Sequence, residues 1–157
     1  MSDYRVRVAT PADVDALVHH RVGMFSDMGV PIDDAALARA FGPWVDAALQ
    51  SGIYRAWVVD DHSGGGVSIV AGGGITVLPW PPGPRYLSDR LAFVYNVYTE
   101  PPHRRRGIAR LIMNAIHDWC RLNGIKSIAL NASDEGRPLY EAMGYRVSPN
   151  AMMFLAL

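Results

Sequence analysis

One segment restricts the fold more than any other: the run from Gly107 to Asn123, whose apolar residues recur at intervals of three and four. This spacing places them on one face of an amphipathic helix. Strongly apolar runs that read as strands precede the helix at 91–99 and follow it at 125–130. A strand, a helix and a second strand in this order predict a sheet that is at least partly parallel, with helices packed on it. The sequence therefore predicts an α/β fold.

The rest of the chain fits the same plan. Further strands are predicted at 4–8, 53–59 and 67–78, and a last one from Tyr145 toward Leu157. Further helices are predicted from Thr10 to about Met28, from about Asp33, and after Ser133. We expect the first strand to have one buried face and the two middle strands to form an antiparallel hairpin. Gly42-Pro43 is expected to kink or split the second helix.

Length and composition restrict the class of protein. With 157 residues, the chain is expected to form a single domain over 1–157. The 15 basic and 15 acidic residues cancel, which removes any global electrostatic argument for binding nucleic acid or an anionic membrane. One cysteine, Cys120, and a polar amino terminus favour a cytoplasmic protein. The longest apolar stretch is broken by glycines and prolines, so we expect no membrane span, and the five histidines show no metal-ligand spacing.

The strongest chemical signal is a cluster of arginines where the central helix is expected to begin. Arg104, Arg105, Arg106 and Arg110 surround Gly107. Unpaired backbone amides and the helix dipole make such a helix start an anion site, and forked guanidinium groups suit a diphosphate. No G-x-x-x-x-G-K-[ST] loop or G-x-G-x-x-G turn is present, which argues against ATP and dinucleotides. The alternative reading is a solvated, charged helix end.

Two motifs make the chain resemble the GNAT superfamily of acyl-coenzyme A dependent N-acetyltransferases. Residues 104–109, RRRGIA, fit the family's [QR]-x-x-G-x-[GA] pattern, and residues 139–145, LYEAMGY, resemble its L-Y-E-x-x-G-[FY] segment. The order of expected helices and strands also agrees over nearly the whole chain. The resemblance implies a GNAT-like mixed central sheet flanked by helices, and an enzyme that takes its acyl group from acetyl-CoA.

The resemblance also implies which residues bind the cofactor. In the family, the first motif wraps the diphosphate of coenzyme A, mainly with backbone amides. The matching residues here are Arg104, Arg105, Arg106, Gly107, Ile108 and Ala109, followed by Arg110. The preceding strand, here Val97, Tyr98 and Thr99, lends backbone groups to the pantetheine arm. Ser133 stands where the family often has Asn, and its hydroxyl replaces only part of the hydrogen bonding of an amide.

The catalytic acid implied by the resemblance is Tyr140, which would protonate the departing thiolate. A phenol with a pKa of about 10 stays protonated at pH 7 and can donate to sulfur. The alternative is a tyrosine that only packs in the core. Glu100, Asp89 and His103 are candidates for the base, a water relay serves equally well, and none of them is assigned. Cys120 has no histidine spaced to activate it, so we expect a buried thiol and direct transfer.

The resemblance implies an N-acetyltransferase whose partners are acetyl-CoA and a primary amine of a small molecule or peptide. The alternatives are a noncatalytic module that binds or senses acyl-CoA, and RNA binding through 104–106, which the zero net charge disfavours. The resemblance implies that the acceptor binds at residues 21–30 and 80–86, and Phe25, Trp80 and Tyr95 are either pocket walls or core residues. Homodimers are frequent in the family, so the resemblance allows a homodimer, and the sequence leaves the oligomeric state open.

Overall fold

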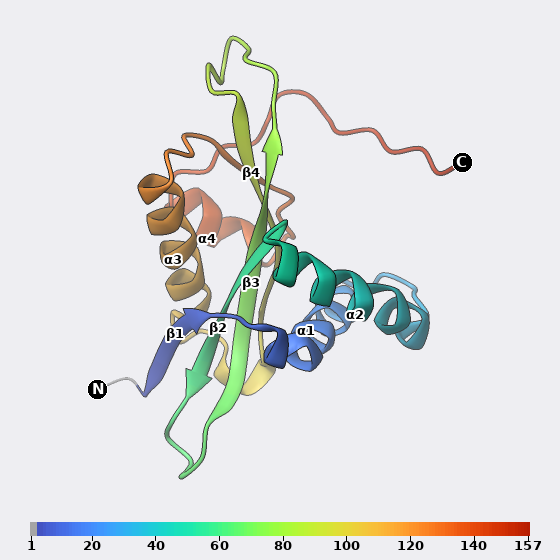
Figure 1. Cartoon of the computed structure of the whole chain (residues 1–157), viewed down its shortest axis with the longest axis vertical. Coiled ribbons are helices and arrows are strands. Elements are labelled where there is room, and N and C mark those ends of the chain that lie inside the picture. The colour runs from blue at the N-terminus through green and yellow to red at the C-terminus, as the bar shows by residue number, and fades with distance from the viewer. Residues whose placement is uncertain (1–2) are drawn as a thin grey trace.

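The computed structural model describes residues 3–157 and shows a twisted sheet with helices on both faces (Figure 1). The strands are β1 (Tyr4–Val8), β2 (Tyr54–Asp61), β3 (Ser68–Pro79), β4 (Arg90–Thr99) and β5 (Ile128–Leu130), and they lie in this order across the sheet. All neighbouring strands are antiparallel except β4 and β5, which are parallel. The predicted α/β fold with a mixed, partly parallel sheet is confirmed, as is the antiparallel hairpin of β2 and β3.

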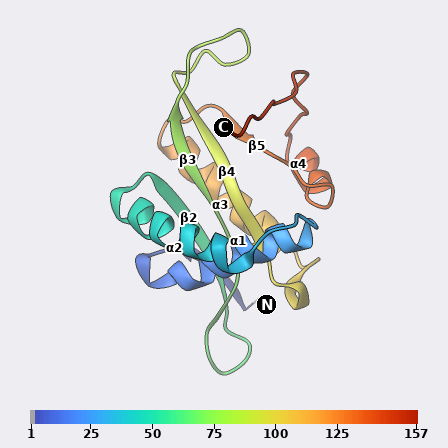
Figure 2. The same ribbon diagram turned by 90° about the vertical axis from the view of Figure 1, so that its right-hand side faces the viewer.

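The helices divide between the two faces of the sheet. The short 3-10 helix η1 (Pro11–Asp13) leads into α1 (Val14–Asp27), and α1 packs beside α2 (Asp34–Ser51) on one face. The other face carries α3 (Ile108–Leu122), which follows the 3-10 helix η2 (Pro101–His103), with α4 (Arg137–Ala142) beside it (Figures 1 and 2). No helix within residues 3–157 combines the length and the apolar character needed to cross a bilayer.

Local chemistry sets the ends of the first two helices. The backbone N–H of Thr10 donates to Asp13 Oδ2 at 2.8 Å, and Asp33 Oδ1 accepts from the N–H of Ala36 at 2.9 Å. Of the two expected effects of Gly42-Pro43, a kink or a split, the split is wrong, because α2 runs unbroken through Pro43. Phe41 and Val45 on either side of the proline are buried, and this packing outweighs the lost backbone hydrogen bond.

Two apolar clusters lie on opposite faces of the sheet. The cluster under α3 contains Val59, Ile75, Val94, Ile108, Ile112, Met113, Ile116 and Cys120, and it also includes Tyr140. The cluster under α1 and α2 contains Leu17, Phe41, Val45, Ala48, Tyr54, Ala56 and Val58. The sheet is thus buried on both sides, and β4 lies between the two layers of helix.

Two expectations about the outer strands are wrong. No face of β1 is buried: Val6 and Val8 are exposed, and Arg7 is held at the edge by Asp13 and Asp60 at 2.8 and 2.7 Å. Residues 145–157 form no strand, and their last part lies apart from the sheet and helices (Figure 1). A strand needs a neighbouring backbone, and among residues 3–157 none pairs with the outer edge of β5.

Candidate active site

The sheet opens between β4 and β5. These strands pair only from Ala92 to Val94, opposite 128–130. Asn96 then adopts a left-handed conformation with φ of 60°, where the register with β3 shifts between Gly72 and Gly74. This β-bulge bends β4 away from β5. Beyond Val94, the outer edge of β4 therefore faces no strand of the described chain.

After the bulge, the backbone groups of β4 point alternately toward β3 and toward the open edge. The N–H of Glu100 donates back to Val70 O in β3 at 2.8 Å, and Tyr98 pairs with Gly72. Because successive residues of a strand direct their backbone groups to opposite sides, Val97 and Thr99 present theirs at the open edge. The Tyr98 ring packs against the His20 ring, with 5.3 Å between the centroids.

A turn with two left-handed residues follows the open edge. Arg105 has φ of 60° and Gly107 has φ of 78°, and α3 begins directly after Gly107. The first amide of α3 with a backbone acceptor is that of Leu111, which donates to Gly107 O at 3.2 Å. Within residues 3–157, none of the amides of 105–110 donates to another group. Six consecutive unpaired N–H groups at a helix start form a strong anion site.

The four arginine side chains have different surroundings. Arg104 Nε donates to Thr99 O at 2.8 Å, and its guanidinium pairs with Asp27 and lies over the Tyr98 ring. Arg106 donates to Tyr4 Oη at 3.0 Å. Arg105 and Arg110 are exposed and form no ion pair within the part of the chain that the structure describes. Arg104 thus fixes the turn to β4, and the other three line its solvent side.

Ser133 and Tyr140 lie on the α4 side of the opening. Ser133 Oγ accepts from the N–H of Gly136 at 3.1 Å and so caps the turn that leads into α4. Tyr140 is 9% exposed and belongs to the same cluster as Val94 and Ile108. Burial raises the pKa of the Tyr140 phenol. Its hydroxyl has no hydrogen-bond partner among the described residues.

The candidate bases lie in other places. Glu100 Oε1 is 2.7 Å from His19 Nε2, and His103 Nδ1 is 2.9 Å from Tyr4 Oη. Asp89 is exposed in the loop between β3 and β4. Cys120 is buried in α3, and burial raises the pKa of its thiol to about 11. The prediction of a buried thiol is confirmed.

A pocket of about 400 Å³ opens on the α1–α2 face at the bulge. It is lined by Arg21, Leu37, Ala40, Phe41, Trp44, Tyr54, Thr76, Tyr95 and Asn96. Of the predicted acceptor residues, Tyr95 and Arg21 line this pocket, whereas Phe25 and Trp80 do not. Phe41 and Trp44 were not predicted as acceptor residues, although their spacing of three places both on one helix face.

The pocket is apolar with a polar floor. Asn96 Nδ2 donates to Tyr54 Oη at 3.1 Å, and Asn96 Oδ1 accepts from Arg21 Nη1 at 2.5 Å. Burial raises the pKa of Tyr54 to about 12, so this phenol is protonated at neutral pH. No Asp, Glu, His or Lys of the described chain lines the pocket. Within residues 3–157, no three His, Cys, Asp or Glu side chains are grouped to hold a metal ion.

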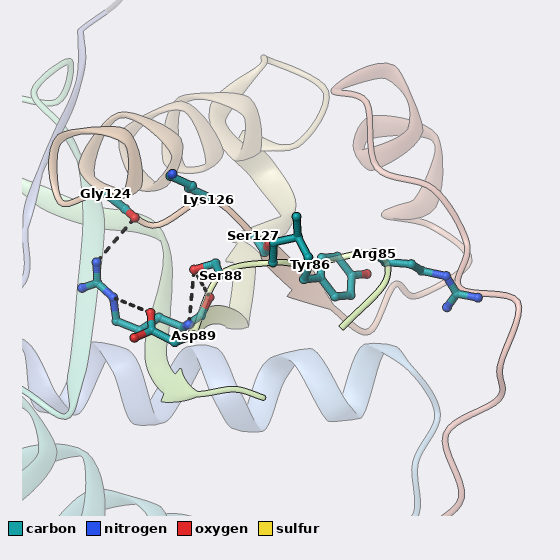
Figure 3. Close-up of a pocket in the computed structure, with 9 residues that line it drawn as sticks. Arg85, Tyr86, Ser88, Asp89, Gly124, Lys126 and Ser127 are labelled. Atoms are coloured by element: carbon teal, nitrogen blue, oxygen red, sulfur yellow. Dashed lines mark hydrogen bonds and ion pairs between the residues drawn. The ribbon is translucent and has the colours of Figure 1, made fainter. Parts of the chain in front are cut away.

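A second hollow of about 730 Å³ lies at the other end of β4 (Figure 3). Arg85 and Tyr86 line it from the β3–β4 loop, opposite Gly124 and Lys126 from the α3–β5 turn. Arg90 Nη2 crosses toward Gly124 O at 3.4 Å. Residues 85–86 of the predicted acceptor loop therefore line this second hollow and not the pocket at the bulge.

Comparison with known proteins agrees with this geometry. Residues 52–147 match the family model described as acetyltransferase (GNAT) domain. The fold resembles a GCN5-related N-acetyltransferase from Ralstonia eutropha JMP134, with TM-score 0.85 and 29% identity over 97% of this chain and 98% of that chain. A predicted acetyltransferase with acetyl-CoA from Clostridium acetobutylicum has TM-score 0.82 and 24% identity, covering 97% and 96%. Glucosamine-6-phosphate N-acetyltransferase from Arabidopsis thaliana has TM-score 0.68 and 16% identity, covering 97% of each chain. No curated protein matches the sequence.

Proposed function

Because the chain belongs to the GNAT family of acetyltransferases and is an acetyl-CoA dependent acyltransferase, we propose that it moves the acetyl group directly to a primary amine of a small molecule or peptide. The Ralstonia relative is described as an N-acetyltransferase, which supports nitrogen as the accepting atom. The two apolar clusters share one sheet, which supports a single catalytic domain over residues 1–157.

The observation that carries the proposal is the continuity of two backbone surfaces: the free amides of 105–110, and an edge of β4 that no strand covers and where Arg104 binds Thr99 O. The free amides of 105–110 follow the open edge of β4 within one turn of chain. A diphosphate on these amides lets an attached chain run along Val97, Tyr98 and Thr99 as an added strand. Arg104 then orders the turn, while Arg105, Arg106 and Arg110 add positive charge around the diphosphate. Ser133 lies on the opposite side of the opening, within the cap of α4.

The chemistry follows from the two faces of this opening. The acceptor nitrogen enters from the pocket beside Asn96 and attacks the thioester carbonyl carbon. The carbon–sulfur bond then breaks, and the sulfur leaves as a thiolate. Tyr140 donates its proton to that sulfur, which releases free thiol, and water returns a proton to the phenol. Because burial raises the pKa of Tyr140, the phenol carries its proton throughout the neutral range.

The amine must be neutral to attack, and no carboxylate, histidine or lysine among residues 3–157 lines the pocket to take its proton. We propose that the proton passes to water. Glu100, Asp89 and His103 are therefore left out of the reaction. Cys120 is also left out, since its thiol is buried in α3. An acetyl group trapped on Cys120 during turnover would contradict direct transfer.

Release of free thiol from acetyl-CoA with a panel of primary amines tests the function. We expect release that depends on the amine, together with an equal amount of N-acetylated product by mass spectrometry. A reaction without amine gives the background hydrolysis. Tight binding of acetyl-CoA with no amine-dependent release for any acceptor would instead favour the noncatalytic module.

A homodimer is proposed from the carboxyl-terminal segment. Met152, Met153, Phe154, Leu155 and Leu157 are exposed, and the outer edge of β5 carries no strand in the described chain. Two copies can cover both features at once if each segment pairs with the other copy's β5. We expect light scattering to give a dimer for the full chain and a monomer after deletion of 152–157. A monomeric full chain would contradict the proposal.

A further inference from the structure

The floor of the acceptor pocket contains an arginine without a counter-ion. Arg21 comes from α1, is partly buried, and lines the pocket beside Asn96. Among residues 3–157, no carboxylate forms an ion pair with it; the groups that act on its charge are the phenols of Tyr54 and Tyr95. An arginine side chain keeps its proton in proteins, so this positive charge is permanent.

The guanidinium is only partly satisfied. Nη1 donates to Asn96 Oδ1 at 2.5 Å, while Nε is buried and has no partner in the described chain. Its carbon lies 5.1 Å from the Phe25 ring centroid and 4.9 Å from that of Phe41. The faces of these two rings stabilise the cation, but they accept no hydrogen bond from the N–H groups, which point outward in the plane of the guanidinium. Asn96 thus fixes Nη1, the buried Nε has no partner, and Nη2 is the accessible nitrogen that no group of the described chain binds.

A partly desolvated cation without an anion is unfavourable in the empty pocket. Desolvation acts against its charge and lowers the pKa of Arg21, which shows that the surroundings do not compensate it. A ligand that brings a negative charge offsets this cost. The accessible Nη2 can donate a charge-assisted hydrogen bond to a carboxylate oxygen of such a ligand.

The walls of the pocket define the rest of the ligand. Phe41 and Trp44 are stacked, with 5.8 Å between ring centroids and 25° between planes, and Tyr95 faces them from β4. A volume of about 400 Å³ suits a small molecule with an apolar or aromatic body. We propose that the acceptor is an amine that carries a carboxylate on such a body, and that Arg21 binds this carboxylate. The inference rests on the proposed function, because it places the amine at the open edge of β4.

Binding of acceptor analogues without an amine tests the inference independently of turnover. The probes are 3-phenylpropanoate, 3-phenylpropan-1-ol and 2-phenylethylphosphonate, titrated by calorimetry in the presence of coenzyme A. We expect the carboxylate to bind about tenfold or more tightly than the alcohol, since hydrogen bonds between charged groups are stronger than those to a neutral hydroxyl. The proposal is overturned if the phosphonate binds more tightly than the carboxylate, or if neither anion binds more tightly than the alcohol.

Variants then assign the preference to one side chain. Arg21→Gln should remove the tenfold advantage, and Arg21→Lys should keep part of it, because it retains the charge without the fork. The matched control is Arg39→Gln, an exposed arginine on α2, which should keep the full advantage. If Arg21→Gln does not fold, the Lys variant and the comparison of probes on the natural protein still decide the outcome. Equal losses for carboxylate and alcohol in the Arg21 variants overturn the proposal.

Turnover provides the second readout. 4-(Aminomethyl)benzoate and benzylamine differ only in the carboxylate. Arg21→Gln should lower kcat/KM for the first about tenfold or more beyond any change that it causes for the second. If both amines are acetylated with no preference for the one that carries the carboxylate, only the role of Arg21 is refuted, and the proposed function stands. Carboxylate-selective binding without any acetyl transfer refutes the proposed function and leaves the anion site in place.

Discussion

A negative charge at the start of α3 should weaken cofactor binding without weakening the fold. Ala109 is the second residue of α3, within the run of free amides that we propose for the diphosphate. A glutamate there lies near the positive end of the helix dipole, which should raise stability by about 0.3–1 kcal/mol. The same carboxylate repels the diphosphate. The substitution should therefore raise stability while it lowers cofactor affinity, a combination that a general disturbance of the fold rarely produces.

The size of the repulsion follows from the exposure of the turn. Arg105, Arg106 and Gly107 are exposed, so the dielectric constant of water applies. A carboxylate about one helical turn, or about 6 Å, from a diphosphate with about two negative charges is repelled by about 1.4 kcal/mol. This corresponds to a loss of about tenfold in affinity. The loss should shrink toward 1 M salt, because the Debye length falls to about 3 Å.

The assay compares Ala109→Glu with Ala109→Gln, which has nearly the same size and no charge. Calorimetric titration gives the Kd of coenzyme A at low and high salt, and thermal unfolding without ligand gives stability. We expect the Gln variant to bind about tenfold more tightly than the Glu variant at low salt. Equal affinities for the two variants, with both folded, would show that the diphosphate is bound elsewhere.

Three further predictions concern the acid, the amine and the edge of the sheet. Tyr140→Phe should lower kcat about 100-fold or more and leave the Kd of acetyl-CoA unchanged. The control Tyr145→Phe should lower kcat far less. Equal kcat values for Tyr140→Phe and the natural enzyme at every pH would exclude Tyr140 as the catalytic acid. The pH at which kcat/KM levels off should follow the pKa of the amine used, and one fixed inflection for amines of different pKa would reveal an enzymic base. Arg7 lowers the pKa of Asp13, so this pair stabilises the fold above the ordinary carboxyl pKa and loses its effect as pH falls below it. Arg7→Met should therefore cost about 1–2 kcal/mol in urea unfolding at pH 7, because Asp13 and Asp60 lose their shared cation, and less near pH 3; an equal loss at both pH values would contradict this reasoning.

The sequence predicted most of the elements that position the cofactor turn. The apolar repeat of α3 and the runs of β4 and β5 are local patterns, and a strand–helix–strand order leaves few arrangements open. The same is true of the turn itself, because arginines and Gly107 at a helix start are a local pattern that indicates free amides. The family resemblance agreed with this reading and added the pantetheine edge and Tyr140, which periodicity alone does not indicate.

The remaining features depend on contacts between distant segments. The apolar run after Gly144 has the composition of a strand, but no described backbone pairs with it. Pro43 stays within α2 because burial of its neighbours offsets the lost hydrogen bond. The pocket takes its walls from α1, α2 and three strands, and its floor depends on the left-handed backbone of Asn96. Neither the bulge nor the isolation of Arg21 leaves a pattern in the sequence.

The most direct test of the account is a crystal structure of the protein grown with acetyl-CoA. We expect the diphosphate oxygens within hydrogen-bond distance of the amides of 105–110, the pantetheine beside Val97 and Thr99, and the sulfur within about 3.5 Å of Tyr140 Oη. The acetyl group should point toward Asn96 and the pocket. A diphosphate bound away from this turn, or a Tyr140 hydroxyl far from the sulfur, would contradict the mechanism.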